Sequence, residues 1–299
     1  MSRTAVRSSL LRSAGLAAML ALLLVGCAAP QIRYATAEQT RTVVSEILDN
    51  ARRLRGTLYG KPALVSFRFR DERGRDRRFI GHPALLLFRP PRCFLLEVRS
   101  ALGPVVARIG SNDQRYWAWV DAGDTRKLWW GTWQALESGR GRDFYIPPDD
   151  LLDVLLLRRA AALFQLDAHD RPRLGPLLEY RGRVPWLIVQ RLGDDALPAV
   201  RRVMQLRTRA PHLPVRLIDY TADGRVWMDA TLGGYARLEG VPDGPWIARR
   251  FVIRWPQRQA EMRLDLHRVR LRRSDVPFCR FPARFHGEIE VLDEPPAGP

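Results

Sequence analysis

The side chains that could carry acid–base or metal chemistry are few in this sequence and lie far apart. No two of the five histidines have the spacing that zinc ligands share. Asp149-Asp150 and Asp194-Asp195 have the composition of catalytic carboxylate pairs, but adjacent side chains point apart, and a helix start and a turn account for them. The sequence also lacks phosphate-binding glycine loops, serine elbows and zinc-protease motifs, so we expect no catalytic residue, no metal and no cofactor. The histidines are His82, His169, His212, His267 and His286.

The amino terminus has the order of residues found in secretory signals. Arg3, Arg7 and Arg12 precede an uncharged apolar run over 14–25, as export requires. That run is shorter than the about 20 apolar residues of a membrane-spanning helix. We therefore expect 1–26 to be a cleaved signal, with a buried apolar helix that contains a cysteine as the alternative.

The apolar run ends in Leu24-Val25-Gly26-Cys27, which resembles the lipobox of bacterial lipoproteins. In that group the cysteine thiol receives acyl chains such as palmitate, and cleavage then makes the cysteine the first residue. The resemblance implies a lipid anchor at Cys27 and a lipidated tether over 27–35. Because Ala28 rather than an aspartate follows the cysteine, it also implies sorting to the periplasm-facing side of the outer membrane.

The chain is strongly basic, and arginine supplies nearly all of its positive charge. The formal net charge of +17 falls to +14 without the signal, which contains three arginines and no acid. A charge of this size suits nucleic acid, anionic lipid headgroups or a solvated surface. Export removes nucleic acid as a natural partner, and the arginines form no basic run. We expect a solvated arginine-rich surface, with attraction to an anionic membrane surface as the functional alternative.

Cys93 and Cys279 are the only cysteines besides Cys27. Export makes a disulfide permissible, and a single pair has only one intramolecular connectivity. Two small buried thiols would explain the pair equally well. The sequence therefore leaves the bond open.

Hydrophobic periodicity predicts an amphipathic helix over 36–55, with one face to bury, followed by a long antiparallel meander. A second helix is expected from Pro147, where proline and two aspartates suit a helix start. Within 261–271 the alternation changes parity, which indicates a bulge or a bend. The tail over 294–299 has nothing to bury and should be disordered. Strands are expected at 64–70, 79–88, 93–99, 104–109, 115–120, 184–190, 200–207, 216–220, 226–231, 246–255 and 261–271.

Bulky apolar side chains gather on these strands, and two interpretations of them stay open. They form either an ordinary packed core or the lining of a cavity for acyl chains, within a sheet too wide to fill itself. The residues expected to bind such a ligand are Phe67, Phe69, Phe94, Leu96, Val98, Val105, Ile109, Trp117 and Trp119.

Turn and strand patterns in the first half of the chain resemble the LolA/LolB group of lipoprotein carriers and receptors. The segments that carry the resemblance are Leu54-Arg55-Gly56, Phe79-Ile80-Gly81-His82-Pro83, Phe88-Arg89-Pro90-Pro91, Glu97-Val98-Arg99-Ser100-Ala101-Leu102-Gly103-Pro104, Ile109-Gly110-Ser111-Asn112, Tyr116-Trp117-Ala118-Trp119 and Ile146-Pro147-Pro148. The resemblance implies a mainly β fold with some α structure (α+β). Residues 36–293 would form an unclosed antiparallel half-barrel, with N-terminal and lid helices on its concave face. It also implies Leu102 as the nearest candidate for a loop that contacts the membrane.

These expectations combine into a non-enzymatic, monomeric lipoprotein of the cell envelope. It would bind acyl chains or lipoproteins, contact the membrane through Cys27 and bind no nucleic acid. The main alternative is a scaffold lipoprotein with a filled core and no lipid cargo. An envelope hydrolase with a dispersed site is a weaker alternative, because it would need convergent titratable residues in a cleft.

Overall fold

The computed structural model describes residues 31–70, 74–122, 125–137, 146–155, 174–192, 197–272, 278–282 and 285–293. The signal expected at 1–26, the anchor Cys27 and the tail expected at 294–299 lie outside these residues, as does the tether up to residue 30. Within the described part of the chain, no helix is long and apolar enough to cross a membrane.

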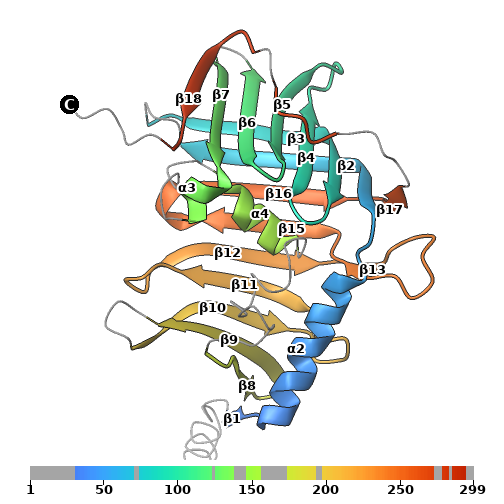
Figure 1. Ribbon diagram of the computed structural model, residues 1–299, viewed down its shortest axis with the longest axis vertical. Helices are drawn as coiled ribbons and strands as arrows, with labels where there is room; N and C mark the ends of the chain where they lie inside the picture. The colour runs from blue at the N-terminus through green and yellow to red at the C-terminus, as the bar shows by residue number, and fades with distance from the viewer. Residues whose placement is uncertain are drawn as a thin grey trace, which may run out of the picture.

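The structure consists mostly of strands, with a few helices between them (Figure 1). In chain order the elements are β1 (Ile32–Tyr34), α2 (Ala37–Arg52), β2 (Thr57–Arg70), β3 (Asp76–Arg89), β4 (Cys93–Arg99), β5 (Val105–Ser111), β6 (Arg115–Ala122), β7 (Thr125–Thr132), α3 (Trp133–Glu137), α4 (Pro148–Val154), β8 (Leu177–Arg181), β9 (Val184–Leu192), β10 (Pro198–Leu206), β11 (Pro214–Tyr220), β12 (Val226–Gly233), β13 (Ala236–Arg237), β14 (Trp246–Ile247), β15 (Arg250–Trp255), the 3-10 turn η1 (Pro256–Arg258), β16 (Ala260–Leu266), β17 (Val269–Arg272) and β18 (Glu288–Val291).

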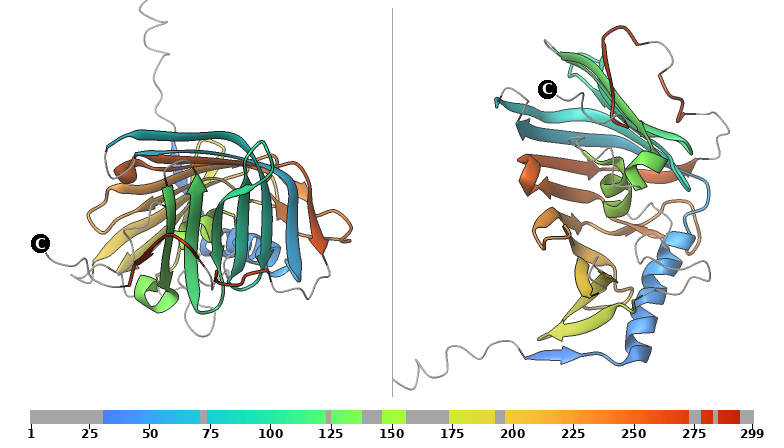
Figure 2. Two further views of the ribbon diagram at one scale, coloured as in Figure 1. Left: turned by 90° about the horizontal axis from the view of Figure 1, so that it is seen from above. Right: turned by 60° about the vertical axis from the view of Figure 1, so that its left-hand side comes forward.

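Sixteen of the strands form one sheet, in the order β1-β8-β9-β10-β11-β12-β15-β16-β2-β3-β4-β5-β6-β7-β18, with β17 also paired to β2. All pairings in this sheet are antiparallel except that of β18 with β7. The outermost strands β1 and β18 do not pair with each other, so the sheet is open. The mainly β class and the unclosed sheet expected from the sequence are therefore confirmed. Figure 2 shows that the sheet is strongly curved.

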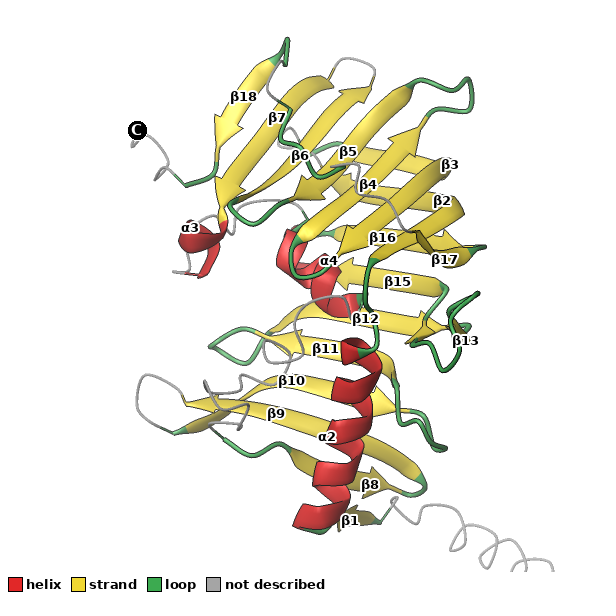
Figure 3. Ribbon diagram, turned by 45° about the vertical axis from the view of Figure 1, so that its right-hand side comes forward, coloured by secondary structure: helices red, strands yellow, loops and turns green. Residues whose placement is uncertain are grey.

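The first helix follows from its sequence as expected. Thr36 caps it, because the Thr36 hydroxyl accepts from the backbone of Gln39 while the Gln39 side chain accepts from the backbone of Thr36. The buried face of α2 contains Val43, Ile47 and Leu48. Figures 2 and 3 show α2 and α4 on the same side of the sheet, inside its curve.

The strands differ from the sequence prediction in number and in detail. Most of the expected strands are present, and the bend expected within 261–271 divides that segment into β16 and β17. The sequence prediction missed β1, β7, β8, β13 and β18, since these are very short or lack a clean alternation of apolar and polar residues. It also treated 246–255 as one strand, whereas the structure divides this segment into β14 and β15.

Candidate functional site

An apolar hollow lies between the hairpin of β2 and β3 and the strands that follow it. Its free volume is ≈ 100 Å³. The hollow is lined by Val65, Phe67, Phe69, Phe79, Leu96, Val98, Val106, Ala107, Ile109, Ala118, Trp119, Val120, Trp129, Ile146 and Met262. Every one of these residues is apolar, so the hollow offers a ligand burial of hydrocarbon and no charged side chain to bind.

Three phenylalanines form one wall of the hollow. The rings of Phe67 and Phe69 lie 5.3 Å apart between centroids, and the Phe69 ring stacks on that of Phe79 at 6.4 Å. All three side chains are only half-buried. This wall is therefore less tightly enclosed than the opposite wall, where Leu96 is 1% exposed.

The hollow contains several of the residues that the sequence predicted for ligand binding. Phe67, Phe69, Leu96, Val98 and Ile109 all line it. Their role in binding stays a prediction, but the structure brings them together from three different strands.

Three of the predicted residues, Phe94, Val105 and Trp117, do not line the hollow, and the structure gives the reason for each. Phe94 is completely buried, at 0% exposure, and belongs to the packed core. Val105 is displaced by a register shift: Val98 faces Ala107, whereas Arg99 faces Val105. This bulge puts one extra residue into β5 and changes the parity, so that Val106 lines the hollow where the alternation had placed Val105.

The prediction for Trp117 was wrong about the face of the sheet on which its side chain lies. Its indole covers Gly110 so closely that a Cβ there would lie 2.5 Å from the ring. On the same outer face it meets the ring of Phe281 edge-on, at 5.7 Å. Trp119 borders the hollow, but its ring also meets that of Phe285 at 6.3 Å, among the outer residues. These tryptophans are therefore covered by the C-terminal part of the chain, which the sequence prediction had not placed.

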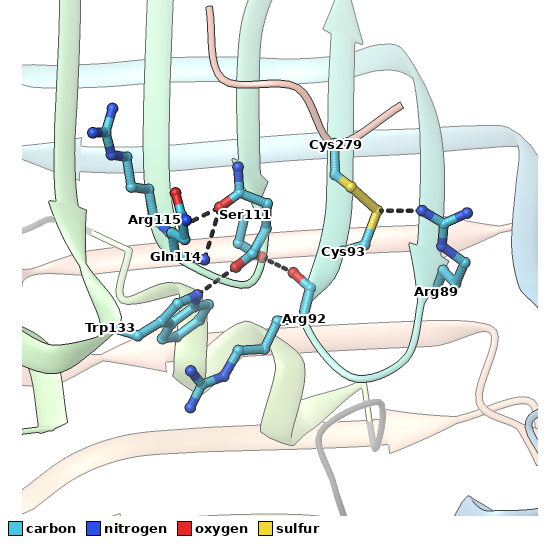
Figure 4. The surroundings of a disulfide bond; sticks show 9 residues. Arg89, Arg92, Cys93, Ser111, Gln114, Arg115, Trp133 and Cys279 are labelled. Carbon is cyan, nitrogen blue, oxygen red and sulfur yellow. Dashed lines mark hydrogen bonds between the residues drawn. A yellow bond between two sulfur atoms is a disulfide. The ribbon is translucent and has the colours of Figure 1, made fainter. Parts of the chain in front are cut away.

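A disulfide between Cys93 and Cys279 ties this C-terminal part to the sheet (Figure 4). The two Cα atoms lie 5.4 Å apart, a normal separation for a disulfide. The bond that the sequence left open is thus formed in the structure. It fixes the segments 278–282 and 285–286, here called the C-terminal strap, against the outer face of β4 to β7.

Buried acids attach α4 to the inner face of the sheet. One oxygen of Asp150 accepts hydrogen bonds from the indole nitrogens of Trp227 and Trp255, both at 2.8 Å. Burial, followed by the charges of Asp149 and Asp219, raises the pKa of Asp150 well above its ordinary value of 3.8. The sequence had explained this acid as part of a helix start, and it does lie in the first turn of α4. Its burial against two tryptophans was missed, because those residues lie far away in the sequence.

The second attachment of α4 is a buried ion-pair group. Arg202 is 2% exposed, and its guanidinium donates to Asp153 of α4 at 2.7 Å and to both carboxylate oxygens of Asp219 at 2.6 and 2.7 Å. The two acids raise the pKa of Arg202 and keep it charged, against the opposing effect of burial. Neither α4 nor α2 places a side chain in the lining of the hollow. Ile146, which directly precedes Pro147 and α4, does line the hollow.

The turn between β4 and β5 presents Leu102 to solvent. Its side chain is 95% exposed, and the turn is closed by hydrogen bonds from Gly103 to the Ser100 carbonyl and from Ser100 to the Pro104 carbonyl. The role of Leu102 in a loop that contacts the membrane stays a prediction. Among the residues the structure describes, no group of three or more histidines, cysteines and acids could hold a metal ion.

No protein-family model matches the chain, and no curated protein matches its sequence. Among solved structures, a DUF1329 family protein from Desulfovibrio piger has 13% identity and a TM-score of 0.47, over 79% of this chain and 93% of that one. A LolA superfamily protein from Nitrosomonas europaea has 12% identity and a TM-score of 0.46, over 80% and 97%. A domain assigned to outer membrane lipoprotein sorting in Vibrio parahaemolyticus has 10% identity and a TM-score of 0.40, over 79% and 94%. The structural neighbours thus include a LolA superfamily protein and a domain for outer membrane lipoprotein sorting.

Proposed function

We propose that this protein binds the acyl chains of a lipid or lipoprotein in the apolar hollow, without catalysing a reaction. The observation that carries the proposal is the lining of the hollow, in which every residue is apolar. Burial of an acyl chain there would contribute about 0.8 kcal/mol for each methylene group. Polar groups are not needed for binding of this kind, which fits the scarcity of candidate catalytic residues.

The size of the hollow requires that it widen to accept a chain. Its ≈ 100 Å³ is below the about 300–1,000 Å³ of typical ligand pockets. The half-buried rings of Phe67, Phe69 and Phe79 form the wall that can move at the lowest cost, because they have fewer packed neighbours to displace than the buried aliphatic side chains opposite. The proposal therefore includes an outward movement of this aromatic wall when cargo binds.

We further propose that the open sheet acts as a half-barrel, with α2 and α4 on its concave face, and that Cys27 attaches it to the outer membrane on the periplasmic side. The lipobox resemblance supports the anchor, and the structural neighbours include a LolA superfamily protein from N. europaea and a domain for outer membrane lipoprotein sorting from V. parahaemolyticus. In this arrangement the receiving cavity is held at the membrane surface. Cargo could then pass into the bilayer with little exposure to water.

A scaffold lipoprotein with a filled core is the second candidate function. The small volume of the hollow favours it, since a cavity of ≈ 100 Å³ could be a packing defect of a wide sheet. The two functions differ in whether the purified protein binds an acyl chain saturably.

A fluorescent fatty-acyl probe tests the proposal directly. It should bind saturably and change the emission of Trp129, which lines the hollow. The variant Ala107→Phe places a ring in the hollow and should weaken binding at least tenfold while the protein stays folded. Ala199→Phe, at a half-buried alanine of β10, is the matched control and should bind as the parent does. Saturable binding absent from the parent, or unchanged by Ala107→Phe, would exclude the hollow as the site. Native mass spectrometry should in addition detect a co-purifying lipid.

A further inference from the structure

A second and larger cleft lies on the outer face of the sheet, under the C-terminal strap. Its volume is ≈ 570 Å³, within the range of about 300–1,000 Å³ that is typical of ligand sites. The sheet provides its floor from β4 to β7, and Phe278, Phe281 and Phe285 of the strap form its walls. The cleft is separate from the apolar hollow, because the strands lie between the two.

Aromatic rings and charged groups meet in this cleft. The half-buried indole of Trp119 and the ring of Phe285 stand nearly perpendicular, at 89°. The guanidinium of Arg108 lies 5.6 Å from the centre of the same indole. A ligand in the cleft therefore finds an apolar platform with a cation at its margin.

The charges lining the cleft do not cancel. Glu97 accepts hydrogen bonds from Arg108 at 3.0 Å and from Arg99 at 2.5 Å, and Asp121 pairs with Arg126 at 3.1 Å. Arg280 of the strap is exposed and forms no ion pair with any residue that the structure describes. Three arginines thus face two carboxylates in the lining, which leaves an excess of positive charge.

The mixture of donors and acceptors narrows the chemistry of the ligand. An acyl or aromatic acid would use the cations and the rings, but it would gain nothing from Glu97 and Asp121 and would be repelled by them. A saccharide carries hydroxyl groups that both donate and accept, so it can use carboxylates and guanidinium groups together. A carboxylate on that saccharide would pair with Arg280 in a charge-assisted geometry.

We propose that the outer cleft binds an acidic saccharide, with a sugar ring against Trp119 and Phe285 and its carboxylate on Arg280. The open side of the cleft would let one unit of a longer polymer enter. The site does not depend on acyl binding, since Trp119 is the one residue, among those the structure describes, that lines both the cleft and the apolar hollow. It gives the protein a means to hold an anionic carbohydrate at its surface.

Calorimetric titration of the purified protein tests the site, with a trimer of galacturonic acid as the acidic probe and galactotriose as its neutral match. The acidic trimer should bind saturably and at least tenfold more tightly than the neutral one. Arg280→Gln should weaken binding of the acidic trimer about tenfold, because it removes a charge-assisted hydrogen bond. Arg209→Gln removes an exposed arginine from the connection between β10 and β11 and should change binding less than twofold.

Three results would overturn the proposal: no saturable binding of the acidic trimer, equal binding of the two trimers, or binding unaffected by Arg280→Gln. Displacement of the trimer by the fatty-acyl probe would also overturn it, since it would place the sugar in the hollow. Arg280→Gln should leave acyl binding unchanged. A failure of sugar binding with acyl binding intact would therefore refute this site alone, and the reverse result would refute only the acyl proposal.

Discussion

Replacing Asp150 with alanine should destabilise the protein by about 2–5 kcal/mol, because two indole N–H groups lose their acceptor at about 1–3 kcal/mol each. The indole of Trp255 is 1% exposed and cannot reach water. The unpaired N–H of Trp255 should therefore cost close to the upper end of this range, about 3 kcal/mol. Trp227 is only half-buried and should recover part of its loss through water. Urea unfolding followed by tryptophan emission measures the difference in the free energy of unfolding.

Asp150→Asn separates the hydrogen bonds from the charge. The amide oxygen of asparagine can accept both indole bonds, so this variant should keep most of the stability that alanine loses. Burial raises the pKa of Asp150 in the folded state, and a carboxyl with a raised folded pKa favours folding least when the pH is high. As pH rises above about 4, the unfolded wild type releases this proton first, and its stability falls relative to that of Asp150→Asn by up to about 1.4 kcal/mol per pH unit.

The free energy of unfolding of Asp150→Asn should therefore increase relative to that of the wild type from pH 4 to pH 7. Titrating groups that do not interact with Asp150 affect both proteins alike and cancel in the difference, whereas the charges of Asp149 and Asp219 act on Asp150 and belong to the same effect. If Asp150→Asn is as unstable as Asp150→Ala at every pH, the ionised carboxylate is what α4 requires. If the difference does not change with pH, the pKa of Asp150 is not raised.

Three further substitutions test other parts of the structure by urea unfolding. Arg202→Ala should cost about 3–5 kcal/mol by leaving two buried carboxylates unpaired; a loss below 1 kcal/mol would contradict the buried ion-pair group. Gly110→Ala should cost about 1–3 kcal/mol through overpacking and shift the emission of Trp117, and an unchanged spectrum would argue against the outer-face position of that indole. Cys93→Ala should cost up to about 5 kcal/mol on the chain-entropy account of a long closed loop. Reduced wild-type protein should be as unstable as Cys93→Ala. If oxidised wild type, reduced wild type and Cys93→Ala were equally stable, the disulfide would be contradicted.

The periodicity of the sequence was sufficient to predict the first helix, most strands and the bend between β16 and β17. Such elements depend on the local alternation of apolar and polar residues, which the sequence displays directly. It was insufficient to say which face of a strand is covered. One bulge in β5 exchanged Val105 for Val106, and the strap provided a second apolar environment, for Trp117, outside the curve of the sheet.

The buried polar contacts lay further beyond the reach of the sequence. Arg202 looks like one more surface arginine in a chain rich in them, and its two acids lie in α4 and β11. Asp150 looked like an ordinary residue of a helix start. In both cases the deciding partners are 17 to 105 residues away, and no local pattern marks a side chain that is buried by distant partners.

The pairing of β2 with β16 determines the order in which the strands of the sheet can pair during synthesis. β2 emerges early in synthesis, but its neighbour on one side is more than a hundred residues downstream, and the strap that covers β6 and β7 comes later still. β2 keeps an unpaired edge until β16 emerges, and Trp117 keeps an uncovered ring until Phe281 emerges, so the early half of the sheet stays incomplete until then. A chain shortened before Cys279 would keep both the open outer tryptophan surface and a β7 edge without β18. Such a truncated product should therefore associate with itself or with a chaperone more readily than the full chain does.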